Sequence, residues 1–242
     1  MKDVRKCDLQ MIQFLQTQTT NYLTEDMFYN KFLFWLKRLQ PFILESGRPP
    51  MNADGFVRLF RLLYGCGLRV TEGISLEKRD IDLNHGLVTI RKPKTGHKKK
   101  FRTDGTVVDN VQSQRTTILP YDIPMLEKHI DQLSSNDKLF PVNRHIVWQY
   151  GKDAGNLAGL NIGEIQGNRI IDGVWNHLMR KSCSKRMQQL GASRELRMLK
   201  LRHVFRDAHD AYDVADINAL KNFEALHFSN LPLQSVGDGI RN

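Results

Sequence analysis

Four residues in the C-terminal third of the chain have side chains that together suit a phosphate-like anion. His177 and Arg180 are three positions apart, so on a helix they share one face. His203 follows Arg180 by 23 residues, and Tyr212 follows His203 by nine. An arginine fork fits phosphate oxygens, a histidine exchanges protons near neutral pH, and a tyrosine hydroxyl attacks once a neighbour takes its proton. A basic helix pair with an incidental histidine and tyrosine is the alternative.

The charge of the chain agrees with an anionic ligand. Between His177 and Tyr212, nine Lys and Arg residues stand against three Asp and Glu residues. The whole chain of 242 residues has a formal net charge of +10. A surplus of this size on a globular protein points to a polyanion, most often nucleic acid, although a generic basic protein would show it too.

Composition favours an intracellular globular protein. Hydrophobic residues make up 40% and charged residues 26%, which permits a packed core in one large or two small domains. The three cysteines are scattered and form no CxxC pair, so neither a disulfide framework nor a zinc site is predicted. With no signal peptide and no membrane-length apolar run, we expect a cytoplasmic location without membrane contact.

A second arginine lies at the junction of two predicted helices. Arg69 follows a helix that Gly65 and Gly67 end, and Glu72 stands three positions further on. Two interpretations remain open at this point. The pair is structural, or Glu72 orients Arg69 toward a phosphate.

The most basic stretch of the chain is RKPKTGHKKKFR, residues 91–102. Pro93 and Gly96 break it, so we interpret it as a hairpin loop between strands at 87–91 and 115–119 that meets DNA phosphates. A solvated basic loop is the alternative. The predicted DNA contacts are Lys92, Lys98, Lys99, Lys100, Arg102, Lys181 and Arg202.

Helical periodicity dominates the rest of the chain. Apart from the helix that carries His177 and ends at Gly191, helices are predicted at 5–22, 24–44, 53–65, about 71–76, 124–135, from about 144, 192–201, 206–212 and 216–226. Residues 103–114 and 161–169 are interpreted as polar connections without regular structure.

The segments GCGLRVTEGISL, KPKTG, HLMR and LRH, with a tyrosine nine residues later, resemble the tyrosine recombinase family of phage and archaeal integrases and Xer-type resolvases. Six positions match in type and order: Arg69, Lys94, His177, Arg180, His203 and Tyr212. One position departs from the pattern, because Arg202 stands where the family usually has glycine.

The resemblance implies a mainly α (α+β) fold, a helical tyrosine recombinase catalytic domain with a small antiparallel β-sheet at one edge. We expect an N-terminal helix or remnant at 1–23, the catalytic domain at 24–215, and a C-terminal helix with a flexible tail at 216–242. Members usually carry a separate helical core-binding domain, for which too few residues precede Arg69.

The resemblance also implies a chemistry without metal or nucleotide cofactor. Tyr212 would attack a DNA phosphodiester and form a 3′-phosphotyrosyl bond, while Arg69 and Arg180 hold the non-bridging oxygens. His177 would be the general base and Lys94 the general acid toward the 5′-oxygen.

In the same scheme His203 would hydrogen-bond a phosphate oxygen, and the partner would be double-stranded DNA. The family further implies a homo-tetramer on two DNA sites, with the C-terminal helix docked either on a neighbour or on its own subunit. Two other functions stay open: strand relaxation of the type IB topoisomerase kind, and a DNA-binding module without catalysis.

Overall fold

A computed structural model of the chain describes residues 21–39, 51–91, 97–101, 107–111, 113–160, 162–166, 169–172, 177–203 and 216–228. For the strands at 97–101, 107–111, 163–166 and 169–172 only the backbone is described. The helices predicted at 5–22 and 206–212 lie outside these residues.

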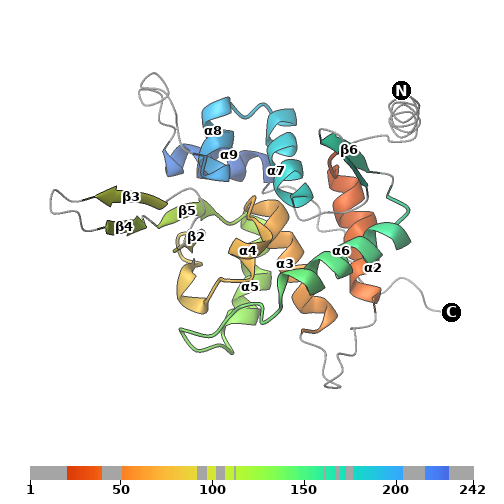
Figure 1. Ribbon diagram of the computed structural model, residues 1–242, viewed down its shortest axis with the longest axis horizontal. Helices are drawn as coiled ribbons and strands as arrows, with labels where there is room; N and C mark the ends of the chain where they lie inside the picture. Colours follow the sequence, from red (N-terminus) through yellow and green to blue (C-terminus); the bar gives the residue numbers. More distant parts are fainter. Residues whose placement is uncertain are drawn as a thin grey trace.

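Helices form the body of the described chain, and short strands lie at its edges (Figure 1). In chain order the helices are η1 (Met27–Phe32), α2 (Leu33–Arg38), α3 (Ala53–Gly65), α4 (Val70–Gly73), η2 (Lys78–Asp80), η3 (Pro120–Asp122), α5 (Ile123–Ile130), α6 (Arg144–Leu157), α7 (Leu178–Gln189), α8 (Arg194–Leu201) and α9 (Ile217–Phe228). The strands are β1 (Ile81–Asp82), β2 (Leu87–Ile90), β3 (His97–Phe101), β4 (Val107–Val111), β5 (Gln114–Thr117), β6 (Gly163–Gln166) and β7 (Arg169–Asp172). The predicted fold class is confirmed.

Local capping explains where several helices begin. The Asn52 side chain accepts a hydrogen bond of 2.8 Å from the backbone N–H of Gly55 and starts α3. Thr24 accepts in the same way from Met27, at 3.3 Å, ahead of η1 and α2. Both caps lie where the sequence predicts a helix start.

Helix α3 is the centre of the core because it packs against α2 on one side and α7 on the other. Aromatic side chains fill the contacts around it. The rings of Phe28 and Tyr64 stack with centroids 4.0 Å apart, and those of Phe56 and Tyr150 stack at 3.9 Å. The apolar face of η1 and α2 is therefore core, as predicted, whereas residues 40–44 of the predicted helix lie outside the described residues.

The three-stranded sheet has the order β1-β2-β5, and both pairings are antiparallel. Val88 pairs with Thr116, and both are fully buried under the helices. The C-terminal helices α8 and α9 both pack on strand β5 of this sheet.

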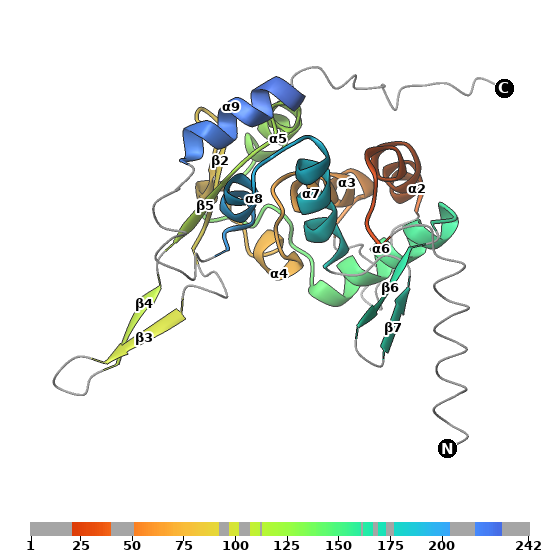
Figure 2. The same cartoon turned by 90° about the horizontal axis from the view of Figure 1, so that it is seen from above.

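Two further hairpins correct the sequence interpretation. Strands β3 and β4 pair across the stretch that was expected to be a basic loop and an irregular connection, and β6 pairs with β7 where a loop was expected. Backbone pairing forms these strands without the alternation of apolar residues on which strand prediction relies. Both hairpins extend from the same side of the molecule, with α4 between them (Figure 2).

The C-terminal helix α9 packs on its own subunit, against α8, β5 and η3. Asp216 begins it by accepting a hydrogen bond of 2.6 Å from the backbone N–H of Ala219. Leu220 and Phe228 are buried in this contact.

Candidate functional site

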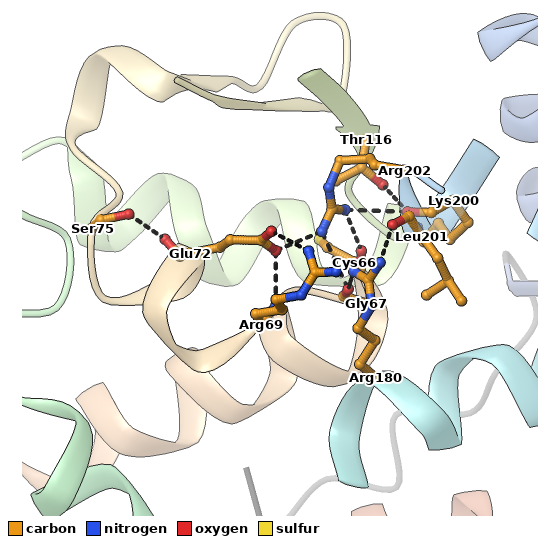
Figure 3. Close-up of polar contacts among 10 residues, drawn as sticks. All are labelled: Cys66, Gly67, Arg69, Glu72, Ser75, Thr116, Arg180, Lys200, Leu201 and Arg202. Carbon is orange, nitrogen blue, oxygen red and sulfur yellow. Dashed lines mark hydrogen bonds and ion pairs between the residues drawn. The ribbon is translucent and has the colours of Figure 1, made fainter. Parts of the chain in front are cut away.

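Arg69 and Glu72 form a pair at the start of α4. The Arg69 Nη1 donates to Glu72 Oε1 at 2.9 Å, and the backbone N–H of Arg69 donates to Glu72 Oε2 at 2.8 Å (Figure 3). Glu72 is buried, whereas the Arg69 side chain keeps 20% of its surface exposed. The carboxylate therefore holds Arg69 in place, while part of the Arg69 side chain stays accessible.

The chain reaches Arg69 through a left-handed turn at Gly67, which has φ +60°. A Cβ atom here would lie 2.6 Å from Leu201 Cδ2, so glycine is needed both for the backbone angle and for the close approach of α8. This approach brings the Arg69 segment against the C-terminal third of the chain.

Arg180 uses the same turn as an anchor. Its Nη1 donates to the carbonyl of Gly67 at 2.6 Å, and its Nη2 donates to the carbonyl of Leu201. The side chain is 3% exposed. Burial, followed by the positive charges of Arg202 and Arg69, lowers the pKa of Arg180 to about 10. Arg180 thus stays protonated at neutral pH and links two segments more than a hundred residues apart in sequence.

Arg202 is the one non-glycine residue with positive φ in the described chain, with φ 55° and ψ 40° at the end of α8. A left-handed conformation costs a non-glycine residue roughly 1–2 kcal/mol. Its side chain is buried, and its Nη2 donates to Glu72 Oε2 at 2.7 Å. The same guanidinium donates to the carbonyls of Cys66 at 3.3 Å and Lys200 at 3.2 Å.

This geometry corrects one expectation from the sequence. Arg202 was expected to contact DNA, but 5% of the residue is exposed, and its Nη1 and Nη2 atoms donate to groups inside the protein. Instead, it donates to Glu72 Oε2, while the Arg69 side chain donates to Oε1 of the same carboxylate. Arg202, which stands where the family usually has glycine, thus adopts the left-handed backbone conformation that a glycine would adopt.

His203 follows directly and is exposed. Partial burial, followed by the positive charges of Arg180, Arg69 and Arg202 and a contribution from His177, lowers the pKa of His203 below its ordinary value of 6.5. The groups that act on His203 are those the sequence predicts for one site. Its imidazole is neutral at physiological pH and can donate one hydrogen bond to an anion.

His177 is exposed at the N-cap of α7, and its carbonyl accepts the backbone N–H of Lys181 at 3.0 Å. Arg180 follows in the first turn of the same helix. Lys181, a predicted DNA contact, is partly exposed on that helix. The predicted pairing of His177 and Arg180 on one helical segment thus agrees with the structure.

The cluster as a whole carries surplus positive charge. The guanidinium groups of Arg69 and Arg202 both bond the Glu72 carboxylate, while that of Arg180 donates to the carbonyls of Gly67 and Leu201. Burial opposes the charge on Glu72, but Arg202 and the hydrogen bonds from Arg69 outweigh it, and the pKa of Glu72 lies below its ordinary value. An incoming anion would relieve the repulsion among the three guanidinium groups.

Several predicted residues are not placed. Lys92, Lys94, Arg102 and Tyr212 lie outside the described residues, and for Lys98, Lys99 and Lys100 only the backbone of β3 is described. Their roles stay predictions. What the structure brings together is Arg69, Glu72, Arg180, Arg202 and His203.

Sequence reasoning missed a second layer behind the site. Lys200, which precedes Leu201, is 1% exposed; its Nζ donates to Glu224 of α9 at 2.5 Å and to both oxygens of Thr117, at 2.9 and 3.0 Å. The backbone carbonyl of Lys200 accepts the Thr116 hydroxyl at 3.0 Å. A lysine on an amphipathic helix is normally read as solvent-exposed, so no sequence signal marked it.

In the described part of the chain, no three His, Cys, Asp or Glu side chains gather as a metal site would require. No described helix has both the length and the apolar character of a membrane span.

Known recombinases resemble this chain in sequence and in fold. The tyrosine recombinase XerA of Thermococcus kodakarensis is 28% identical over 141 residues, which are 58% of this chain and 46% of that protein. A crystal structure of XerA recombinase superposes with a TM-score of 0.51 at 18% identity, covering 85% of this chain and 64% of that one. A XerH site-specific recombinase bound to difH substrate superposes with a TM-score of 0.50 at 16% identity, covering 84% of this chain and 49% of that one.

The structural likenesses show the fold, and the chain spans about half the length of the XerA relative. The family match covers more of this chain than the XerA relative does. The phage integrase family matches residues 55–203, more than half of the sequence, from α3 to His203. The segment contains the Arg69–Glu72 pair, Arg180 and His203. The chain therefore belongs to the phage integrase family of tyrosine recombinases.

Proposed function

We propose that this chain is the catalytic part of a site-specific DNA recombinase that cuts and rejoins DNA through a phosphotyrosyl bond at Tyr212. The observation that carries the proposal is the convergence of Arg69, Arg180 and His203 around one positively charged cluster. Arg180 is held in this cluster by hydrogen bonds to the carbonyls of Gly67 and Leu201, which lie near opposite ends of the segment that matches the family.

The cluster suits charge stabilisation rather than substrate recognition alone. Arg69 keeps exposed donors, while Arg180 and Arg202 supply positive charge from the interior. In a buried setting such fixed charges act strongly on the negative charge that develops at a phosphodiester in the transition state. Loss of one such donor typically reduces a rate about 10²–10³-fold.

Tyr212 would attack the phosphorus and release the 5′-oxygen, to which Lys94 would give a proton. His177 would take the Tyr212 proton, and His203, neutral because of its lowered pKa, would donate a hydrogen bond to a phosphate oxygen. The 5′-hydroxyl of a second strand then attacks the phosphotyrosine. Because the covalent link retains the bond energy, and the arginines offset the charge, we propose that neither metal nor nucleotide is required.

The shape of the chain favours DNA as the substrate. The hairpins β3–β4 and β6–β7 extend on the same side, on either side of α4, whose start carries Arg69 (Figure 2). Strand β3 holds the three consecutive lysines of the basic stretch. The XerH structure with a similar fold is bound to its difH substrate. We propose that duplex DNA lies across this side and that a homo-tetramer joins two sites.

A suicide-substrate assay tests the proposal. Because the target sequence is unknown, a randomised duplex pool is first enriched by binding to the Tyr212→Phe protein. This variant should bind DNA without forming the covalent adduct, so the pool is selected by binding alone. Sets of enriched duplexes, each with a nick at a different position along the selected sequence, are then incubated in EDTA with each protein. We expect a protein–DNA band that resists SDS in the wild type and is absent with Tyr212→Phe.

Tyr22→Phe is the matched control, because its hydroxyl accepts a hydrogen bond from Gln189 on the exposed surface, at 2.8 Å. It should form the adduct at the wild-type rate. Specific binding without any adduct in the wild type would contradict the proposal and favour a DNA-binding module. Adducts that relax supercoiled DNA but never join two duplexes would favour topoisomerase-type chemistry.

A further inference from the structure

We propose that Arg202 is a positioning residue of the active site, which fixes the Glu72 carboxylate so that Glu72 in turn orients Arg69. The inference rests on the proposed function, since it concerns how the phosphate-binding arginine is held. Figure 3 shows the arrangement, in which the guanidinium groups of Arg69 and Arg202 both bond the Glu72 carboxylate.

Glu72 has one carboxylate and two arginine partners. Its Oε1 accepts from Arg69 Nη1 at 2.9 Å, and its Oε2 accepts from Arg202 Nη2 at 2.7 Å and from the Arg69 backbone N–H at 2.8 Å. Without Arg202, Oε2 would retain a single backbone donor, and both remaining hydrogen bonds to the carboxylate would come from Arg69 itself. Arg202 thus fixes the orientation on which the Arg69 side chain depends.

Arg202 also connects the two halves of the site. Its side chain leaves the end of α8 and donates to the carbonyls of Cys66 and Gly67, each at 3.3 Å, in the turn that leads to Arg69. Arg180 donates to Gly67 from α7 and to Leu201 at the end of α8. The two buried arginines therefore join the Arg69 segment to the end of α8, where His203 follows.

The backbone of Arg202 supports a specific role for the side chain. Its φ of 55° is the conformation that glycine adopts freely and that other residues adopt only with strain. A residue in a strained conformation needs compensating contacts, and here the guanidinium group supplies hydrogen bonds to Glu72 and to the carbonyls of Cys66, Gly67 and Lys200.

The test separates positioning from packing. Arg202→Gly removes the guanidinium and at the same time relieves the backbone strain, so it should fold well. We expect it to bind enriched DNA as the wild type does, but to form the adduct about 10–100-fold more slowly under single-turnover conditions, the range typical of groups that hold ligands in place. If Arg202→Gly is unstable, Arg202→Lys keeps a charge without the fork and should be slow as well.

Coupling to Glu72 provides the readout that a structural role alone would not give. Glu72→Gln should also slow adduct formation, and the double variant should be no slower than the slower single variant, because both act through the same carboxylate. As a control, Arg197→Ala removes a partly exposed arginine of α8 whose side chain donates to the Ser193 carbonyl at 3.4 Å. It should leave the rate unchanged.

An adduct rate of Arg202→Gly equal to that of the wild type would overturn the inference. So would rate losses that multiply in the double variant, because independent sites behave in that way. Absence of adduct in the wild type would instead refute the proposed function, so the two failures are distinguishable.

Discussion

Breaking the buried ion pair between Lys200 and Glu224 should destabilise the protein strongly. The two residues are 1% and 2% exposed, and their Nζ and Oε1 atoms lie 2.5 Å apart. Burial opposes the charge on Lys200, but Glu224 outweighs it and raises the pKa of Lys200 above its ordinary value. Glu224→Leu would leave a buried ammonium group whose remaining acceptors are the two oxygens of Thr117.

Loss of one partner of a buried pair typically costs about 3–5 kcal/mol. Because Thr117 still solvates the ammonium in part, we expect the lower end, about 3 kcal/mol, which corresponds to a fall in Tm of roughly 6–12 °C for a chain of this size. Lys200→Met combined with Glu224→Leu removes both charges and should come within about 1 kcal/mol of the wild type.

Urea unfolding followed by circular dichroism measures all four members of this cycle. Lys31→Met is the surface control: Lys31 and Asp26 lie 3.6 Å apart with side chains 52% and 62% exposed, and exposed pairs contribute at most about 1 kcal/mol. A loss below about 1 kcal/mol for Glu224→Leu would refute the reasoning. A double variant as unstable as the sum of the single variants would refute it too.

Three further predictions follow from single positions. Gly67→Ala should lose more unfolding free energy than Gly159→Ala, since both have φ near +60° but only the Gly67 Cβ meets Leu201, at 2.6 Å; equal losses in urea unfolding would show that the contact is relieved. Asn52→Ala should cost about 1 kcal/mol by removing the cap of α3, and an unchanged unfolding midpoint would contradict that role. In an NMR titration the pKa of His203 should lie below 6.5, because partial burial and nearby cations lower it. Because the pKa of His203 is lower in the folded than in the unfolded protein, the stabilisation from its neutral form is complete above the unfolded pKa. It is lost as the pH falls from there toward the folded pKa. A measured pKa above 6.5 in the folded protein would contradict this prediction.

Local signals in the sequence predicted much of the fold. Asn52 begins α3 through a contact three residues away, and the helix near Arg144 begins where predicted. The hairpin β3–β4 was missed because five consecutive positions from His97 to Phe101 include three lysines. Its pairing with β4 depends on backbone geometry across a connection, which apolar periodicity does not record.

In the site, too, local features were predicted from the sequence and contacts between distant residues were not. Arg69, Arg180 and His203 were predicted from their segments, and the pair of Arg69 with Glu72 was predicted from its spacing of three. The position of Arg202 at a helix end was visible as an arginine where glycine would fit. The inward direction of its side chain depends on a carboxylate that lies 130 residues earlier, and no local rule supplies that contact.

The central claim is that Tyr212 is the residue that becomes linked to DNA, and mass spectrometry of the adduct tests it most directly. Trypsin releases residues 207–221 as one peptide, in which Tyr212 is the single tyrosine. After nuclease digestion of the purified adduct, this peptide should carry a nucleotide joined through its 3′-phosphate to Tyr212. A nucleotide on any other residue, or a 5′-phosphate linkage, would contradict the account.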